Sequence, residues 1–295
     1  MNTPGWAWAV VVALAVPGAM GQSIPVPNGS FEEPATAFVD LRIDPWQRTE
    51  KPPWFDEGGG FLWGQLVGTF ANTAPGKPDH IANLDGKQAA WLFVVSGAGI
   101  WQQLAPEGSA NPVRYEPGKA YQLSVDLLGN GGGMLPGTPL EVGFCHVRPD
   151  GTRAVVATRT VLNDPGLFPV RTQMTTFRVT TPVVAASDPW AGRPVAISAV
   201  STVTRDAEGG YWDLDNFRVT AAAAPEVSME SGPDGLRLSW TTSRGWRYRA
   251  WRSGDLKAWS PLPGLVEGSG EVARVPVARE GDDHGFFRVE VAPGE

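Results

Sequence analysis

The sequence predicts an all-β chain built from two β-sandwich domains. Three observations lead to this fold class. Stretches in which apolar and polar residues alternate, as strands require, recur about every 10 to 20 residues. No stretch keeps a helical period between recognisable caps. The 36 glycines and 27 prolines supply many turns, a pattern that favours a sandwich over a propeller.

The N-terminal segment has the features of an export signal. Residues 6–16 form an uncharged apolar run that is too short for a comfortable membrane span, and the small residues Ala19 and Gly21 fit a cleavage site. The first five residues lack the Lys or Arg that such signals usually carry. We expect residues 1–21 to be a signal peptide and the mature protein to be secreted or periplasmic.

The strands expected after this segment follow one another closely. Residues 88–95 are apolar on both faces, so this strand should lie in the middle of a covered sheet. Residues 119–127 alternate cleanly, and Asp150-Gly151 marks a hairpin turn. The predicted strands of this region cover residues 61–70, 88–95, 99–104, 119–127, 140–147, 153–161, 175–180, 195–203 and 211–219.

A change of composition divides the chain at residues 221–226, where four alanines precede Pro225 and Glu226. We expect a linker there and a separate small β domain at 227–292. The strands predicted within that domain are residues 236–240, 246–251, 272–277 and 286–291.

The last strand of the larger region carries a chemical signal. At period two, Asp213 and Asp215 share a face with Phe217 and Val219, which should point inward. A buried carboxylate is costly unless a cation or several donors compensate it. Glu32, just after the first strand, could supply a second oxygen for a hard cation such as Ca²⁺. The alternative is that the two aspartates lie at a solvated strand end or turn.

Two motifs carry a family resemblance. Asn-Gly-Ser-Phe-Glu at 28–32 and Asp-Asn-Phe-Arg-Val at 215–219 resemble the ends of galactose-binding-like jelly-roll domains, which include carbohydrate-binding modules of secreted bacterial proteins. The resemblance covers residues 24–220 and implies a jelly-roll β-sandwich. In that family the Glu of the first motif and the Asp of the last help to hold a structural calcium, which implies Glu32 and Asp215 as metal ligands here.

The small C-terminal region resembles another kind of module. Ser-Gly-Asp-Leu-Lys-Ala-Trp at 253–259 and Phe-Phe-Arg-Val at 286–289 match motifs of the fibronectin type III or immunoglobulin-like modules appended to secreted bacterial proteins. The resemblance implies a small β-sandwich that serves as a spacer.

Composition and missing motifs weigh against several functions. A net charge of −7 argues against nucleic-acid binding. Cys145 is the one cysteine, so no disulfide forms within the chain, and it is expected to be a buried, inert thiol. The sequence holds no nucleophile elbow, histidine pair or phosphate loop. We expect no catalytic site, although carboxylate pairs for glycoside cleavage cannot be recognised from sequence spacing.

The 13 tryptophans are the positive feature of the composition. Sugars stack their C–H faces on aromatic rings, while neighbouring polar groups bond to the hydroxyls. Trp46 and Trp54 lie in a long Pro- and Gly-rich stretch at 44–60, which is a candidate binding loop. Trp101 is followed by the amide of Gln103 two positions later. We predict that these four residues bind carbohydrate, with core packing as the alternative for the tryptophans.

Together these patterns predict an exported, non-catalytic carbohydrate-binding protein with a structural calcium ion and a polysaccharide or glycan as its partner. Trp91, within the run that is apolar on both faces, is expected to lie in the core. The first alternative is a structural or adhesive surface protein whose jelly roll binds a protein partner. The second is a polysaccharide-active hydrolase or lyase.

Overall fold

The structure is a computed structural model that describes residues 21–105, 111–232, 235–277 and 285–292. All but the last residue of the predicted signal peptide lies outside the described residues. Strands account for nearly all the regular structure, which confirms the all-β prediction. The chain divides into two compact units, Ser23–Ala221 and Ala222–Ala292. The short 3-10 helices are η1 (Glu57–Gly59), η2 (Trp63–Gln65) and η3 (Arg205–Ala207).

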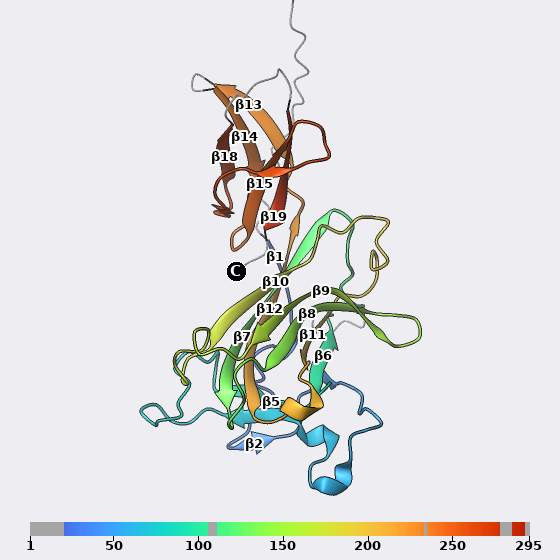
Figure 1. The fold of residues 1–295 in the computed structure, drawn as a ribbon, viewed down its shortest axis with the longest axis vertical. Helices are drawn as coiled ribbons and strands as arrows, with labels where there is room; N and C mark the ends of the chain where they lie inside the picture. The colour runs from blue at the N-terminus through green and yellow to red at the C-terminus, as the bar shows by residue number, and fades with distance from the viewer. Residues whose placement is uncertain (1–20, 106–110, 233–234, 278–284, 293–295) are drawn as a thin grey trace, which may run out of the picture. The chain divides into compact units, whose positions relative to one another are not determined.

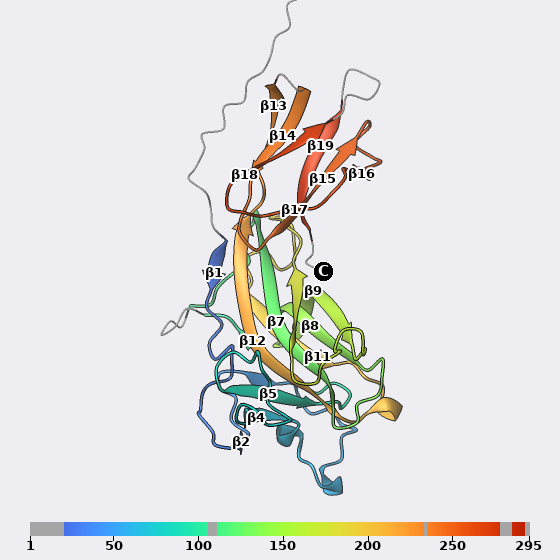
Figure 2. The ribbon, with the colours of Figure 1, turned by 90° about the vertical axis from the view of Figure 1, so that its left-hand side faces the viewer.

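The larger unit contains a seven-stranded sheet with the order β10-β7-β12-β5-β4-β2, in which β1 also pairs with β12 (Figure 1). The long strands β7 and β12 form its centre, as Figure 2 shows from the side. Its strands are β1 (Gln22–Ile24), β2 (Val39–Asp40), β4 (Val67–Ala71), β5 (Gln88–Phe93), β7 (Lys119–Gly131), β10 (Thr175–Thr180) and β12 (Tyr211–Ala223).

A second sheet of five strands has the order β3-β6-β11-β8-β9. Its pairs are antiparallel; for example, Ser198 of β11 lies opposite Trp101 of β6 and Gly143 of β8. The two sheets form a jelly-roll β-sandwich. The strands of the second sheet are β3 (Gln47–Arg48), β6 (Gly99–Gln103), β8 (Pro139–Val147), β9 (Arg153–Leu162) and β11 (Ala196–Ser201).

One hydrophobic core joins the inner faces of the two sheets. The alternation of the strands places one apolar set inward, and each buried large side chain contributes about 1.5–3 kcal/mol through removal from water. The fully buried members of this core include Leu92, Val125 and Trp212 from the first sheet and Ile100, Phe144 and Ile197 from the second.

The alternation of inward and outward side chains along β12 shifts by one residue between Leu214 and Phe217. Trp212 and Leu214 share the core with Phe217, so the intervening backbone contains one extra residue. Asn216 has a φ of 55° and absorbs this irregularity. The prediction that Asp213 shares a face with Phe217 is therefore wrong. Asp213 lies on the outer face of the seven-stranded sheet.

Two other local predictions need correction. Residues 61–70 do not form one strand, because the indole of Trp63 turns inward within η2 and its Nε1 donates to the carbonyl oxygen of Thr49 at 2.7 Å. The strand β4 begins only at Val67. In addition, β12 continues through Ala223, so the first half of the predicted linker at 221–226 is strand.

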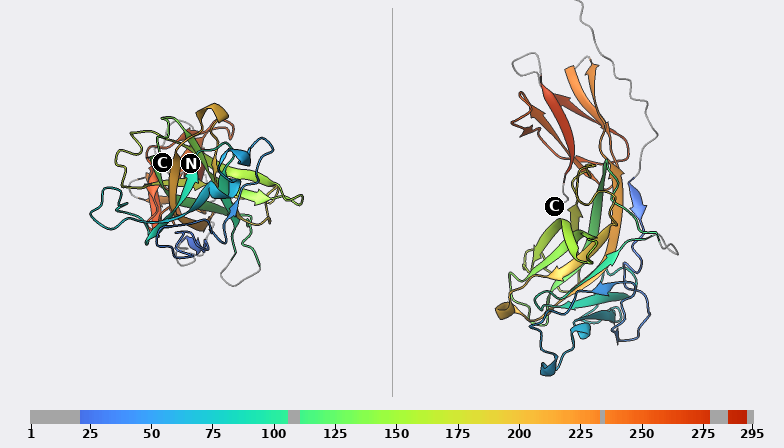
Figure 3. Two further views of the ribbon diagram at one scale, coloured as in Figure 1. Left: turned by 90° about the horizontal axis from the view of Figure 1, so that it is seen from below. Right: turned by 90° about the vertical axis from the view of Figure 1, so that its right-hand side faces the viewer.

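The smaller unit contains two further sheets, with the orders β13-β14-β18 and β16-β15-β17, and β19 pairs with β15 (Figure 2). Its strands are coloured orange to red in the right-hand view of Figure 3. Trp240, Trp246 and Tyr248 are its largest fully buried side chains. Its strands are β13 (Val227–Gly232), β14 (Gly235–Thr241), β15 (Arg247–Ser253), β16 (Ser260–Pro261), β17 (Val266–Glu267), β18 (Val272–Val277) and β19 (Phe286–Ala292).

Candidate functional site

The two predicted metal ligands meet the same loop, residues 85–88. Glu32 Oε1 accepts hydrogen bonds from the backbone N–H groups of Lys87 and Gln88, both at 2.8 Å. Asp215 Oδ2 accepts from the backbone N–H of Asp85 at 2.7 Å. The two sequence motifs are therefore brought together from opposite ends of the larger unit.

Backbone amides supply the hydrogen bonds that these two carboxylates accept, whereas calcium requires six to eight oxygen ligands. Within the described ranges, no group of three or more His, Cys, Asp or Glu side chains could hold a metal ion. Burial raises the pKa of Asp215 to about 8, although the amides of Asp85 and Asn216 act in the opposite direction. The carboxylates of Asp85 and Asp126 lie near enough to raise the pKa of Asp215 further.

Trp46 does not have the surface position that carbohydrate stacking requires. Its side chain is only 3% exposed, stacks on Phe31 with ring centroids 5.5 Å apart, and meets the Phe217 ring at 4.7 Å. Its Nε1 donates to the carbonyl oxygen of Asn28 at 3.0 Å. The prediction that Trp46 binds carbohydrate is therefore wrong, because the stretch at 44–60 folds back onto the first motif.

The other predicted binding residues lie on the surface, but at separate places. Trp54 is 36% exposed, and the Arg205 guanidinium lies 4.6 Å from the centre of its ring. Trp101 and Gln103 share the outer face of β6, where the Arg153 guanidinium lies 5.1 Å from the Trp101 ring. A cation thus already lies over each of these two tryptophan rings.

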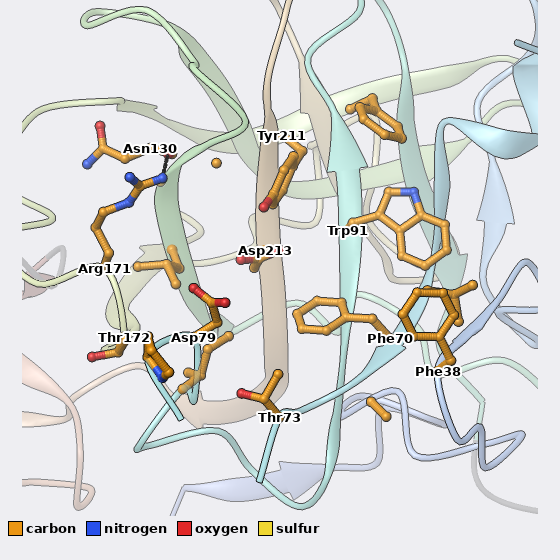
Figure 4. A pocket seen from close by; sticks show the side chains of 18 residues that line it. Phe38, Phe70, Thr73, Asp79, Trp91, Asn130, Arg171, Thr172, Tyr211 and Asp213 are labelled. Atoms are coloured by element: carbon orange, nitrogen blue, oxygen red, sulfur yellow. Dashed lines mark hydrogen bonds between the residues drawn. The ribbon is translucent and has the colours of Figure 1, made fainter. Parts of the chain in front are cut away.

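A pocket of about 610 Å³ opens on the outer face of the seven-stranded sheet (Figure 4). Its size falls within the range typical of small-molecule sites. The lining residues are Phe38, Val39, Phe70, Ala71, Thr73, Pro78, Asp79, Ile81, Trp91, Phe93, Leu128, Gly129, Asn130, Gly131, Arg171, Thr172, Tyr211 and Asp213.

Two loops create the pocket by covering part of this face. Residues 72–87 and 163–174 bond to each other through Ala82 N–H, which donates to the Thr172 carbonyl oxygen at 2.9 Å. The backbone N–H of Met174 donates to the side-chain oxygen of Asn83 at 2.8 Å. These bonds hold the loops together at the edge of the pocket.

Half-buried aromatic rings form the wall of the pocket. Trp91 comes from β5, Phe70 from β4 and Tyr211 from β12. The Trp91 ring lies directly over Gly68, where a Cβ atom would come within 2.3 Å of it. The Tyr211 ring lies over Gly131, where a Cβ atom would come within 2.5 Å of the ring. The two glycines allow these rings to lie close to the sheet.

Polar groups gather in the same pocket, where Asp79 and Tyr211 point toward its middle in Figure 4. Asp213 is 8% exposed and has no hydrogen-bond or ion-pair partner among the described residues. Burial alone raises its pKa to about 8. Burial also raises the pKa of Tyr211, with Asp213 and Asp79 acting in the same direction and Arg171 against them.

Sequence reasoning missed this site although two signals pointed toward it. Trp91 was expected in the core because residues 88–95 are apolar on both faces; the second apolar face instead lines the pocket. The sequence pattern groups Asp213 only with Asp215, on one face of the last strand. Neither signal reveals that the loops before β5 and before β10 meet over the sheet.

Comparisons with known proteins give distant likenesses only. No family model matches the chain, and no curated protein sequence matches it. A cyclase from Fischerella sp. TAU is 21% identical with a TM-score of 0.48, covering 68% of this chain and 97% of that chain. The CBM22-1 xylan-binding domain of Paenibacillus barcinonensis Xyn10C is 16% identical with a TM-score of 0.36, covering 72% and 99%. TmCBM61, solved in complex with beta-1,4-galactotriose, is 11% identical with a TM-score of 0.35, covering 66% and 97%.

The fold and the site together define the chain as an all-β protein with a jelly-roll sandwich and an aromatic, acidic pocket on one sheet face. Among the residues that the structure describes, no helix is long and apolar enough to cross a membrane.

Proposed function

We propose that this chain is an exported, non-catalytic carbohydrate-binding protein whose ligand occupies the pocket lined by Trp91, Tyr211 and Asp213. The observation that carries the proposal is the combination of ring faces and polar groups in one cavity of about 610 Å³. A sugar has an apolar C–H face that stacks on an aromatic ring, and hydroxyls that bond to polar side chains. The smaller unit then serves as a fibronectin-like or immunoglobulin-like spacer.

The pocket offers both kinds of contact. The half-buried rings of Trp91 and Phe70 supply stacking surface. Asp79 and Asp213 supply hydrogen-bond acceptors when ionised, and Arg171 supplies donors. The Arg171 side chain is steadied by a hydrogen bond from its Nη2 to the carbonyl oxygen of Asn130 at 2.7 Å.

Replacing Trp91 by alanine is expected to weaken glycan binding by at least about 10-fold, because loss of a stacking face in a desolvated pocket removes more than ~1.4 kcal/mol. Retention on a panel of insoluble polysaccharides and binding to a glycan array measure the change in affinity relative to the unmodified chain. Trp91→Phe, which keeps a ring, should retain part of the affinity. A melting curve of each variant separates loss of binding from loss of folding.

Trp54→Ala is the matched control, since Trp54 is a partly exposed tryptophan of the same unit that does not line the pocket. Its affinity should equal that of the unmodified chain. If Trp54→Ala abolishes binding and Trp91→Ala does not, the pocket is not the binding site. If no glycan is retained by the unmodified chain, carbohydrate binding itself is wrong.

An adhesive role is the second candidate, and one observation favours it. Phe38, Val39 and Leu41, on and next to the edge strand β2, are 78%, 49% and 44% exposed. Exposed apolar side chains at a sheet edge are suited to a protein partner. A chain that binds no glycan, but loses adhesion to a partner on Phe38→Ser, would support this role.

Calcium at Glu32 and Asp215 is a separate prediction that chelation tests. An ion that binds only the folded chain raises the melting temperature. Because backbone amides already bond to both carboxylates, we expect EDTA to change the melting temperature by less than about 2 °C. A larger drop that added calcium reverses would show that the ion binds there and that the loop at 85–88 rearranges around it.

A further inference from the structure

Asp213 is a buried acid for which the described part of the chain provides no partner. It lines the pocket with 8% of its surface exposed. Neither a donor for its carboxylate form nor an acceptor for its acid form lies within hydrogen-bond distance among the described residues. Its carboxyl group opens to the pocket, so a bound ligand can supply the partner that the described chain does not.

The other titratable groups of the pocket do not neutralise Asp213. They are Asp79, Arg171 and Tyr211. Arg171 affects the pKa of Tyr211, whereas burial alone accounts for the raised pKa of Asp213. With both acids ionised, the pocket holds two negative charges and one positive charge, so one further cation would balance it.

The walls of the pocket favour the same kind of ligand. The faces of Trp91, Phe70 and Tyr211 border the space beside Asp213. Aromatic faces attract cations, most strongly where water is displaced. A carboxylate paired with an ammonium group in such surroundings forms a charge-assisted hydrogen bond, which is stronger than a bond to a neutral hydroxyl.

We propose that the pocket selects glycans that carry a free, protonated amino group, such as hexosamine units without an N-acetyl group, and that Asp213 is the residue that selects them. The inference rests on the proposed carbohydrate-binding function and specifies its ligand class. The ammonium group bonds to Asp213, while the apolar face of the same sugar stacks on the wall of the pocket.

A proton should leave when the ligand binds. In the free chain, burial keeps a proton on Asp213 at neutral pH, and an ammonium group next to it favours the ionised form. The binding enthalpy should therefore vary with the ionisation enthalpy of the buffer. A neutral sugar bound to the acid form would show no such variation.

The test compares oligosaccharides of one length by isothermal titration calorimetry on the unmodified chain. Glucosamine tetramers should bind at least about 10-fold more tightly than N-acetylglucosamine tetramers or neutral cello-tetraose. Asp213→Asn, which keeps the shape of the side chain, should abolish this preference and the proton release. Asp206→Asn, at an exposed acid outside the pocket, should change neither.

The possible results separate the two proposals. Equal binding of the three tetramers, or a preference that survives Asp213→Asn, would overturn the selectivity and leave glycan binding intact. Failure of all three tetramers and of the polysaccharide panel would overturn the proposed function. The chain has a net charge of −7, so it could attract any cationic oligomer. Tetralysine tests for this effect of charge alone. If tetralysine binds as tightly as the glucosamine tetramer, the proposed selectivity for amino sugars is wrong.

Discussion

Replacing Trp46 by alanine is expected to lower the free energy of unfolding of the larger unit by about 3–5 kcal/mol, the usual cost of deleting a buried tryptophan. The indole is 3% exposed and packs between Phe31 and Phe217, which come from the two ends of that unit. The substitution also leaves the carbonyl oxygen of Asn28 without its indole donor. Calorimetric or denaturant unfolding of the full chain measures the change.

Trp54→Ala provides the comparison, because the two tryptophans lie eight positions apart in the same stretch of sequence. Trp54 is 36% exposed, so its loss should cost clearly less than the loss of Trp46. A Trp46→Ala chain with an unchanged melting temperature would contradict the buried position of this residue. It would also restore the surface-binding role that the sequence suggested.

Asp213 is expected to make the folded chain less stable as the pH rises from about 4 to about 8. Its pKa is 3.8 ordinarily and about 8 in the folded chain, so the folded state holds the proton more tightly than the unfolded state. Stability is then greatest below the unfolded pKa, falls through this window, and levels off above it. Asp213→Asn should be more stable than the unmodified chain at pH 8, by an amount on the order of a few kcal/mol.

The measurement is the melting temperature of both chains across that window. Asp215 has a pKa raised in the same direction, so some decline should persist in the chain that carries Asp213→Asn. Asp150→Asn is a suitable control, since Asp150 is exposed and hydrogen bonds from Thr152 lower its pKa. Parallel curves for the unmodified chain and Asp213→Asn would show that this carboxyl is solvated or paired in solution.

The tryptophans show that local sequence does not predict which aromatic side chains line a binding site. Trp46 and Trp54 occur in similar local sequence, yet one belongs to the core and the other to the surface. Trp91, which the sequence placed in the core, lines the pocket. A turn-rich stretch supplies no periodicity that could tell these outcomes apart.

The strands themselves were predictable because alternation is a local property. Residues 119–127 and 211–219 fall within β7 and β12, and 88–93 form β5. Glu32 and Asp215, from the first and the last motif, both accept hydrogen bonds from the loop at 85–88. The sequence could not predict what these carboxylates bond to, because either backbone amides or a metal ion can compensate a buried carboxylate.

The sequence by itself thus determined the all-β class and the position along the chain of most strands, since both follow from neighbours one or two positions away. Only the tertiary structure decided the face of Asp213, because the single residue Asn216 at φ 55° shifts the alternation of β12. It also decided the pocket, because the loops at 72–87 and 163–174 bond across about 90 residues of sequence. The burial of a side chain and its hydrogen-bond partners depend on such contacts between distant residues, which the local alternation of apolar and polar residues does not encode.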